Sequence, residues 1–181
     1  MIILTNRLEI KTIDVIDKDD YVKYIKKIKN FIEEWEPKRD KDYYEGNGIR
    51  KEIENKLNEL ESKKGYTYCI YLKGKNEIIG TITINNIVYG PFLSCFLGYK
   101  LSEKYLNNGY MTEALDHIIK IAFNDIGLHR IEANVMPRNI RSQKVLEKLG
   151  FTYEGLSRKY LKINNKWEDH EHYVILNEMV E

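Results

Sequence analysis

One strand–helix–strand passage in the second half of the chain limits its possible folds more than any other feature. Residues 94–101 form an apolar run typical of a strand, residues 110–124 place their apolar side chains at helical spacing, and residues 129–136 are again typical of a strand. Strands joined through a helix run parallel, because antiparallel neighbours need only a short turn. The passage therefore predicts a parallel pair of strands in a sheet that helices cover.

Shorter patterns on either side of this passage predict the rest of the sheet. Strand-forming runs bounded by turns predict further strands at residues 4–11, 66–72, 77–85, 151–160 and 166–177. Three-to-four spacing of apolar residues predicts further helices at residues 21–34, 49–62 and 140–149. We therefore expect the α/β class, with one mixed, mostly antiparallel seven-stranded sheet and helices on both faces.

Composition and charge limit the kinds of partner. The chain has 181 residues, of which 43% are apolar, so we expect one domain over residues 1–181 and exclude intrinsic disorder. Its 29 basic and 28 acidic residues leave a net charge of +1, which provides no attraction to nucleic acid or to an anionic membrane. No window approaches the roughly 18 apolar residues of a membrane span, so we expect a cytoplasmic protein. Cys69 and Cys95 are expected to be buried thiols.

The loop before the long helix is the first candidate binding site. Asn107, Asn108 and Gly109 form a turn that leads into the helix beginning at Tyr110. Free N–H groups and the positive end of the helix dipole favour an anion at such a junction, above all a phosphate. Asn-Gly is also a common plain turn, and spacing alone leaves that alternative open.

The second candidate is the turn into the helix at residues 140–149. Pro137 ends the preceding strand, Asn139 can cap the helix, and Ser142 follows in its first turn. If the parallel strands splay apart, both helix N-termini border one cleft at the carboxyl end of the sheet, where α/β proteins bind ligands. Without such a cleft, Asn139 is a plain helix cap and Ser142 has no further role.

The histidines do not predict a metal site. His170 and His172 lie two residues apart, on one face of the final strand, but no third ligand follows at a suitable spacing. His117 and His129 are expected to be structural. We therefore expect no metal.

Residues 98–155 combine these features in a recognisable order. They read GYKLSEKYLNNGYMTEAL from residue 98 and HRIEANVMPRNIRSQKVLEKLGFTYEG from residue 129. This run resembles the acetyl-CoA-binding half of the GNAT superfamily of N-acetyltransferases, and within it the RimJ/RimL branch of ribosomal-protein alanine N-acetyltransferases. The stretches LTNRL at residues 4–8, WEP at 35–37 and WEDH at 167–170 resemble the same branch, so the resemblance covers nearly the whole chain.

The resemblance implies that acetyl-CoA is the co-substrate and that a splayed strand pair holds it. The backbone of Leu101 would hydrogen-bond the pantetheine arm, and Asn139 and Ser142 would lie along that arm near the thioester. The pyrophosphate would be wrapped by the backbone amides of Asn107, Asn108, Gly109, Tyr110, Met111 and Thr112. The usual phosphate loop of the superfamily has Gln or Arg where this chain has Leu106, and Gly or Ala where it has Met111.

The resemblance also implies direct attack of an amine on the acetyl carbonyl, without an acyl-enzyme. Ser142 matches the serine that serves the RimJ/RimL branch as acid for the departing thiolate, whereas the tyrosine of other members is replaced by Leu146. A carboxylate proposed as base in that branch is replaced by Leu161. Strand alternation puts Glu132 on the face opposite Ile131 and makes it the candidate base. A solvated or ion-paired Glu132 is an equal alternative, and water could carry the proton.

We therefore expect an N-acetyltransferase that acts on a primary amine, with a protein N-terminus as the favoured acceptor. Three alternatives stay open. The acceptor could be a small molecule such as a polyamine, an aminoglycoside or an amino acid. The chain could be a non-catalytic acyl-CoA-binding module, or an RNA-binding α/β protein. Dimers are common in the resembling branch, so a homodimer is also an option.

Overall fold

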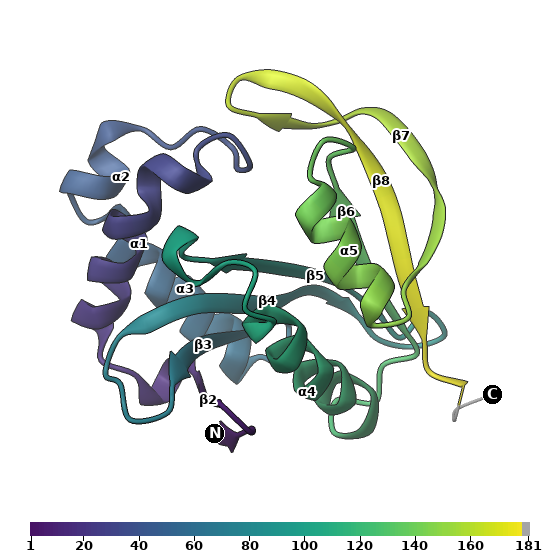
Figure 1. Cartoon of the computed structure of the whole chain (residues 1–181), viewed down its shortest axis with the longest axis horizontal. Helices are drawn as coiled ribbons and strands as arrows, with labels where there is room; N and C mark the ends of the chain where they lie inside the picture. The colour runs from purple at the N-terminus through teal and green to yellow at the C-terminus, as the bar shows by residue number, and fades with distance from the viewer. Residues whose placement is uncertain (179–181) are drawn as a thin grey trace.

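The computed structural model describes residues 1–178, whose strands form one mixed sheet (Figure 1). Residues 179–181, which the predicted domain includes, lie outside the described residues. The strand order from edge to edge is β1-β2-β3-β4-β5-β6-β8-β7. The strands are β1 (Ile2–Leu4), β2 (Leu8–Thr12), β3 (Tyr66–Leu72), β4 (Ile78–Val88), β5 (Ser94–Leu101), β6 (Arg130–Val135), β7 (Thr152–Ile163) and β8 (Lys166–Leu176).

The helices follow the order that their apolar spacing predicts, with one addition. They are α1 (Lys18–Ile32), α2 (Lys41–Glu45), α3 (Gly48–Glu61), α4 (Tyr110–Asn124) and α5 (Ile140–Lys148). The addition is α2, which lies between the predicted helices at residues 21–34 and 49–62. The carboxylate of Asp40 caps it by accepting a hydrogen bond from the Tyr43 backbone N–H at 2.8 Å.

β5 and β6 are the predicted parallel pair, and α4 makes the crossover between them. They pair at three positions, from Ser94 with Arg130 to Phe96 with Glu132, although β5 continues to Leu101 and β6 runs on beside β8. Beyond those positions the two strands diverge, as Figure 1 shows. The pair is therefore splayed at its carboxyl end.

The sheet has eight strands where the sequence predicts seven. One strand was expected over residues 4–11, but a turn divides this segment into β1 and β2, which pair antiparallel. The side chain of Thr5 makes the turn, since its hydroxyl oxygen accepts a hydrogen bond from the Leu8 N–H at 2.9 Å. The rest of the predicted class, one mixed sheet with helices on both faces, is confirmed.

Alternate residues of β3 divide the buried core into two clusters, because side chains of a strand point alternately to its two faces. Tyr68 and Ile70 pack in a cluster with α4, whereas Cys69 and Tyr71 pack in a second cluster with α1 and α3. Cys69 and Cys95 are buried free thiols, as predicted. The sheet therefore separates the helices into two layers.

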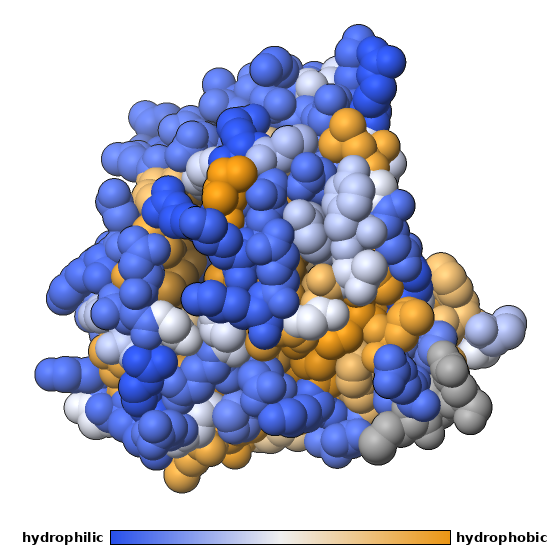
Figure 2. Space-filling model, turned by 45° about the vertical axis from the view of Figure 1, so that its right-hand side comes forward, coloured by the Kyte–Doolittle hydropathy of each residue, from blue (hydrophilic) through white to orange (hydrophobic). Residues whose placement is uncertain are grey.

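The surface seen in Figure 2 is mostly polar. Hydrophilic residues cover most of the face seen in Figure 2, and hydrophobic residues show in gaps between them and in one continuous patch. Among residues 1–178, no helix is both long enough and apolar enough to cross a membrane.

Packing of α4 predicts a large effect for one substitution. Leu115 is fully buried between α4 and the sheet, so Leu115→Ala should lower the free energy of unfolding by about 2–5 kcal/mol in urea denaturation. Lys120→Ala on the exposed side of the same helix loses only an ion pair to Asp116 and should cost less than about 0.5 kcal/mol. Equal losses in the two variants would contradict this account of α4.

Candidate active site

A cavity of about 1000 Å³ lies where β5 and β6 separate. Its walls come from the loop before α4, the start of α5, the carboxyl ends of β5 and β6, and the layer formed by α1 and α3. It is thus bordered by both helix N-termini that follow the parallel strands. This is the position at which α/β sheets usually bind ligands.

The loop into α4 borders the cavity. Asn107 and Gly109 both have positive φ angles, 60° and 74°, which turn the chain sharply before the first helical residue, Tyr110. Leu106, Asn107, Gly109, Tyr110, Met111 and Thr112 all line the cavity. The first amides of α4 have no partner within the helix, so they are available to an anion.

Asn108 does not line the cavity. Its side-chain amide donates a hydrogen bond back to the Leu106 carbonyl at 2.8 Å, and its own carbonyl accepts one from the Arg7 guanidinium at 2.9 Å. The side-chain amide nitrogen and the backbone carbonyl of Asn108 are thus already engaged within the protein.

A brace from the β1–β2 turn holds this loop in place. One oxygen of the Glu113 carboxylate, in the first turn of α4, accepts hydrogen bonds from the Thr5 hydroxyl at 2.6 Å and the Arg7 N–H at 2.8 Å. Its other oxygen accepts one from Arg7 Nε at 2.7 Å, and the guanidinium lies over the Tyr110 ring. Burial opposes ionisation of Glu113, but the hydrogen bonds from Thr5 and Arg7 outweigh it and lower the pKa of this carboxyl.

At the start of α5, Asn139 and Ser142 both line the cavity. Asn139 is the helix N-cap, and its Oδ1 accepts a hydrogen bond from the Ser142 backbone N–H at 3.2 Å. The Ser142 hydroxyl lies 2.6 Å from the hydroxyl of Tyr99 on β5. Burial raises the pKa of Tyr99, so this phenol stays protonated at neutral pH.

Tyr99 is a site residue that the sequence analysis missed. Its place in a strand pattern predicts only a packing role. The catalytic tyrosine of other superfamily members falls on α5, where this chain has Leu146. The available signal was its place on β5, two residues before Leu101, which also lines the cavity. A tyrosine from β5 thus contacts the serine of α5.

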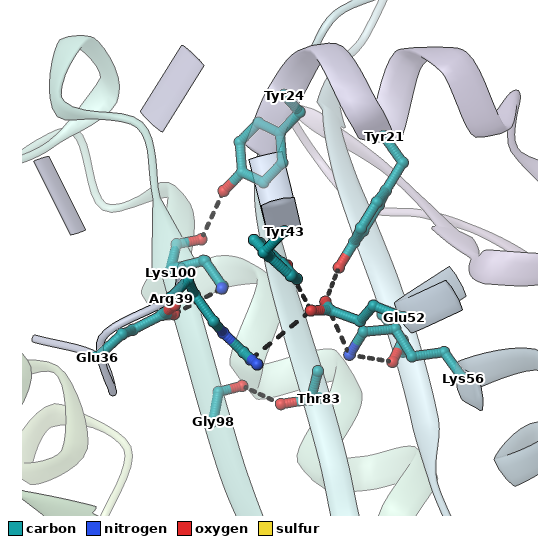
Figure 3. Close-up of polar contacts among 11 residues, drawn as sticks. Tyr21, Tyr24, Glu36, Arg39, Tyr43, Glu52, Lys56, Thr83, Gly98 and Lys100 are labelled. Atoms are coloured by element: carbon teal, nitrogen blue, oxygen red, sulfur yellow. Dashed lines mark hydrogen bonds and ion pairs between the residues drawn. The ribbon is translucent and has the colours of Figure 1, made fainter. Parts of the chain in front are cut away.

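Figure 3 shows the opposite wall, where Glu52 of α3 is held by several donors. It accepts hydrogen bonds from the hydroxyls of Tyr21 and Tyr43, and Arg39 and Lys56 lie within ion-pair distance at 3.7 and 3.8 Å. Burial alone would raise the pKa of Glu52, but Lys56 and the Tyr43 hydrogen bond lower it on balance. Glu52 is therefore an ionised group whose charge is already compensated.

The segment after α1 reaches across the cavity. Glu36 forms an ion pair with Lys100 of β5, also seen in Figure 3. The Glu36 carbonyl accepts a hydrogen bond from the Asn164 N–H at the tip of the β7–β8 hairpin, at 3.2 Å. Arg138 bridges the same two elements, because it bonds the Glu34 carbonyl at 3.0 Å and the Glu168 carboxylate at 3.2 Å.

Glu132 is the predicted catalytic residue that the structure does not bring to this cavity. It lies on β6 at the end where β5 and β6 are still paired, outside the lining. One carboxylate oxygen lies 2.9 Å from His172 Nδ1, and the other accepts a hydrogen bond from Arg130 at 3.2 Å. The ion-paired alternative considered for Glu132 thus describes its surroundings.

Most of the other expected site residues meet in one place. The cavity lining contains Leu101, Asn107, Gly109, Tyr110, Met111, Thr112, Asn139 and Ser142. Within residues 1–178, no group of three or more His, Cys, Asp or Glu side chains is arranged to hold a metal ion.

Comparison with known proteins identifies the family. Residues 7–152 match the family described as the acetyltransferase (GNAT) domain. The chain is 38% identical over 168 residues to the probable N-acetyltransferase YjcK of Bacillus subtilis (strain 168), covering 93% of each chain. It is 33% identical over 167 residues to the ribosomal protein uS5-alanine N-acetyltransferase of Escherichia coli (strain K12), covering 92% of this chain and 86% of that one.

Solved structures of acetyltransferases resemble the fold of this chain. The ribosomal-protein-S5-alanine acetyltransferase of Vibrio fischeri matches with a TM-score of 0.89 at 30% identity, covering 98% of this chain and 97% of that one. Mycobacterium smegmatis RimJ, in complex with CoA-disulfide, matches with a TM-score of 0.85 at 26% identity. The match covers 96% of this chain and 83% of that one. The chain belongs to the GNAT family of acetyltransferases. It is an N-acetyltransferase of the RimJ/RimL type, as the sequence resemblance predicts.

The brace on α4 predicts a pH-dependent contribution to stability. Because the pKa of Glu113 is lowered in the folded state, its contribution is complete above the unfolded value of about 4.3 and is lost as the pH falls through the folded value. Glu113→Gln should cost about 1–2 kcal/mol of unfolding free energy at pH 7. Urea denaturation of the parent and of Glu113→Gln between pH 7 and pH 3 should show that the difference in their unfolding free energies decreases toward low pH.

Glu45→Gln is the matched control, since Glu45 is exposed on α2 and pairs only with Lys41. Its effect should stay below about 0.5 kcal/mol at every pH. If the difference in unfolding free energy between Glu113→Gln and the parent does not decrease on acidification, the role given to the brace is contradicted.

Proposed function

We propose that this protein transfers the acetyl group of acetyl-CoA to the primary amine of a protein N-terminus, as the ribosomal-protein alanine acetyltransferases among its relatives are named for doing. The observation that carries the proposal is the shared cavity: two helix N-termini and a Tyr99–Ser142 hydroxyl pair border one space between splayed strands. The relatives at 33% and 30% identity support the choice of acceptor.

The amide-lined loop would bind the pyrophosphate of acetyl-CoA. In the proposal, the backbone amides of Asn107, Asn108, Gly109, Tyr110, Met111 and Thr112 supply the donors, and the positive end of the α4 dipole adds to the attraction. Backbone donors do not depend on the side chains at Leu106 and Met111, where the chain departs from the usual loop pattern. The CoA-disulfide bound to Mycobacterium smegmatis RimJ supports this assignment.

A row of basic side chains on α5 supports a polyanionic co-substrate. Arg141, Lys144 and Lys148 all line the cavity and recur at three-to-four spacing, so they share one side of the helix. Leu101, at the end of β5, and Asn139, at the start of α5, would flank the pantetheine arm between these charges and the thioester.

Ser142 would act as the acid for the leaving thiolate. In this arrangement Tyr99 donates its hydrogen bond to the Ser142 oxygen, which leaves the serine proton free for the sulfur. Because burial keeps the pKa of Tyr99 raised, the phenol remains a donor throughout the working pH range. The amine attacks the carbonyl carbon directly, so the protein positions the reactants and manages the protons.

Thiol release tests the function and the acceptor class together. The protein is titrated with acetyl-CoA by calorimetry and then assayed with peptides that begin with alanine, the same peptides blocked at the N-terminus, and polyamines. We expect turnover with free N-terminal peptides and none with blocked ones. Turnover of polyamines alone would replace the proposed acceptor with a small amine, and binding without turnover of any amine would contradict enzymatic transfer by this cavity.

Substitution of Ser142 distinguishes a role in catalysis from a role in acetyl-CoA binding. Ser142→Ala should lower kcat about 10²-fold, the ordinary range for a lost acid, with little change in the Kd for acetyl-CoA. Ser62→Ala is the control, because that serine caps the end of α3, away from the cavity. Unchanged kcat in Ser142→Ala would remove the serine from the mechanism.

A further inference from the structure

One buried polar atom in the cavity lacks a hydrogen-bond partner. Asn134 lies on the divergent part of β6 and lines the cavity, and its side-chain oxygen is the buried side-chain polar atom left unsatisfied among residues 1–178. A buried acceptor that is left unpaired is unfavourable, because it has lost its hydrogen bonds to water. A hydrogen-bond donor from a ligand would therefore be favoured at this oxygen.

His170 on β8 borders the same space with a second free acceptor. Its side chain is only 3% exposed, and its Nδ1 lies 3.1 Å from the Glu168 carbonyl oxygen, which can only accept. Nδ1 therefore carries the hydrogen, and the neutral ring keeps its lone pair on Nε2. Among the described residues, no hydrogen bond reaches Nε2.

The surroundings of His170 favour this neutral form. Burial lowers its pKa, and the nearby charges of His172 and Arg138 act in the same direction, whereas Glu168 opposes them. The ring of Tyr160 packs against the imidazole at 5.7 Å between centroids. The imidazole is thus a base that is unprotonated at neutral pH.

Strand register brings the two acceptors together. Asn134 is paired with His172, and His170 lies two residues further along β8 on the same face. Such diagonal neighbours lie about 7–8 Å apart, so the two residues border the same part of the cavity. Both side chains line the cavity that also contains Ser142.

We propose that Asn134 and His170 form the subsite for the acceptor amine, in which Asn134 Oδ1 orients the nitrogen and His170 Nε2 takes its proton. This inference rests on the proposed function and adds the base that it lacks. An α-amine has a pKa of about 7.7–8.0 and is largely ammonium at neutral pH, so it must lose a proton before it can attack a thioester.

The protons balance in this scheme. The ammonium gives one proton to His170 Nε2, and the free amine forms the C–N bond to the acetyl carbon. The C–S bond then breaks, and the thiolate takes a proton from Ser142. The serine is reprotonated with the second proton of the new amide nitrogen, directly or through water, and His170 returns its proton to solvent. The products are the acetylated amine, CoA thiol and one proton.

Glu36 and Glu52, two of the carboxylates that line the cavity, already have partners. Glu52 is held by two tyrosine hydroxyls with two cations nearby, and Glu36 is paired with Lys100. The contacts of Glu52 lower its pKa on balance, so this carboxylate is a weak base. Glu132 lies outside the cavity and bonds Arg130 and His172. His170 is an acceptor that no described residue already occupies.

The test compares His170→Gln with His129→Gln, which replaces a histidine one residue before β6 and outside the cavity. With an alanine-initiated peptide, His170→Gln should lower kcat/KM about 10²-fold at pH 6.5 with no change in the Kd for acetyl-CoA. The difference in kcat/KM between His170→Gln and the parent should decrease toward pH 9, where the amine is already neutral. Asn134→Ala should mainly raise the KM for the peptide, and His129→Gln should match the parent.

Two results would overturn the inference. One is a His170→Gln profile that parallels the parent from pH 6 to pH 9 within threefold. The other is a ¹⁵N spectrum of the imidazole in which the His170 Nε2 signal does not move when the peptide saturates the CoA complex. A parent protein that acetylates no amine would instead overturn the proposed function, so the two failures are distinguishable.

Discussion

The divergence of β5 and β6 after three pairs is the constraint on which the rest of the site depends. Each strand keeps one hydrogen-bonded neighbour, β4 for β5 and β8 for β6, so the sheet does not come apart. Their facing edges retain N–H and C=O groups that need partners when water is excluded. An extended arm with amide groups of its own can complete both ladders, as a peptide does when it adds to a sheet edge.

The same divergence separates the cavity into regions of different electrostatic character. Two helix N-termini and the basic side of α5 favour anions at one end. At the other end the acidic side chains of Glu36 and Glu52 are paired with Lys100, Arg39 and Lys56. The cavity thus suits a highly charged donor together with an acceptor recognised through individual hydrogen bonds.

Local patterns were sufficient for the parts of this structure that depend on neighbours in sequence. The passage over β5, α4 and β6, with its two helix starts, was predicted because periodicity and turn residues report local backbone geometry. Contacts between distant segments leave no such signal, which is why Tyr99 beside Ser142 and Glu113 beside Arg7 were not foreseen. Glu132 was misplaced for a different reason. Strand alternation predicts the face on which a side chain lies, but it does not predict where along the strand the cavity begins.

The contact between the β1–β2 turn and α4 also has a consequence for how the chain matures. Thr5 and Arg7 leave the ribosome more than one hundred residues before Glu113, the group they hold. The contact cannot form before residue 113 has been synthesised. The loop before α4 therefore gains this brace only after the N-terminal turn has docked against a helix that is synthesised much later. A partly synthesised chain would lack the brace.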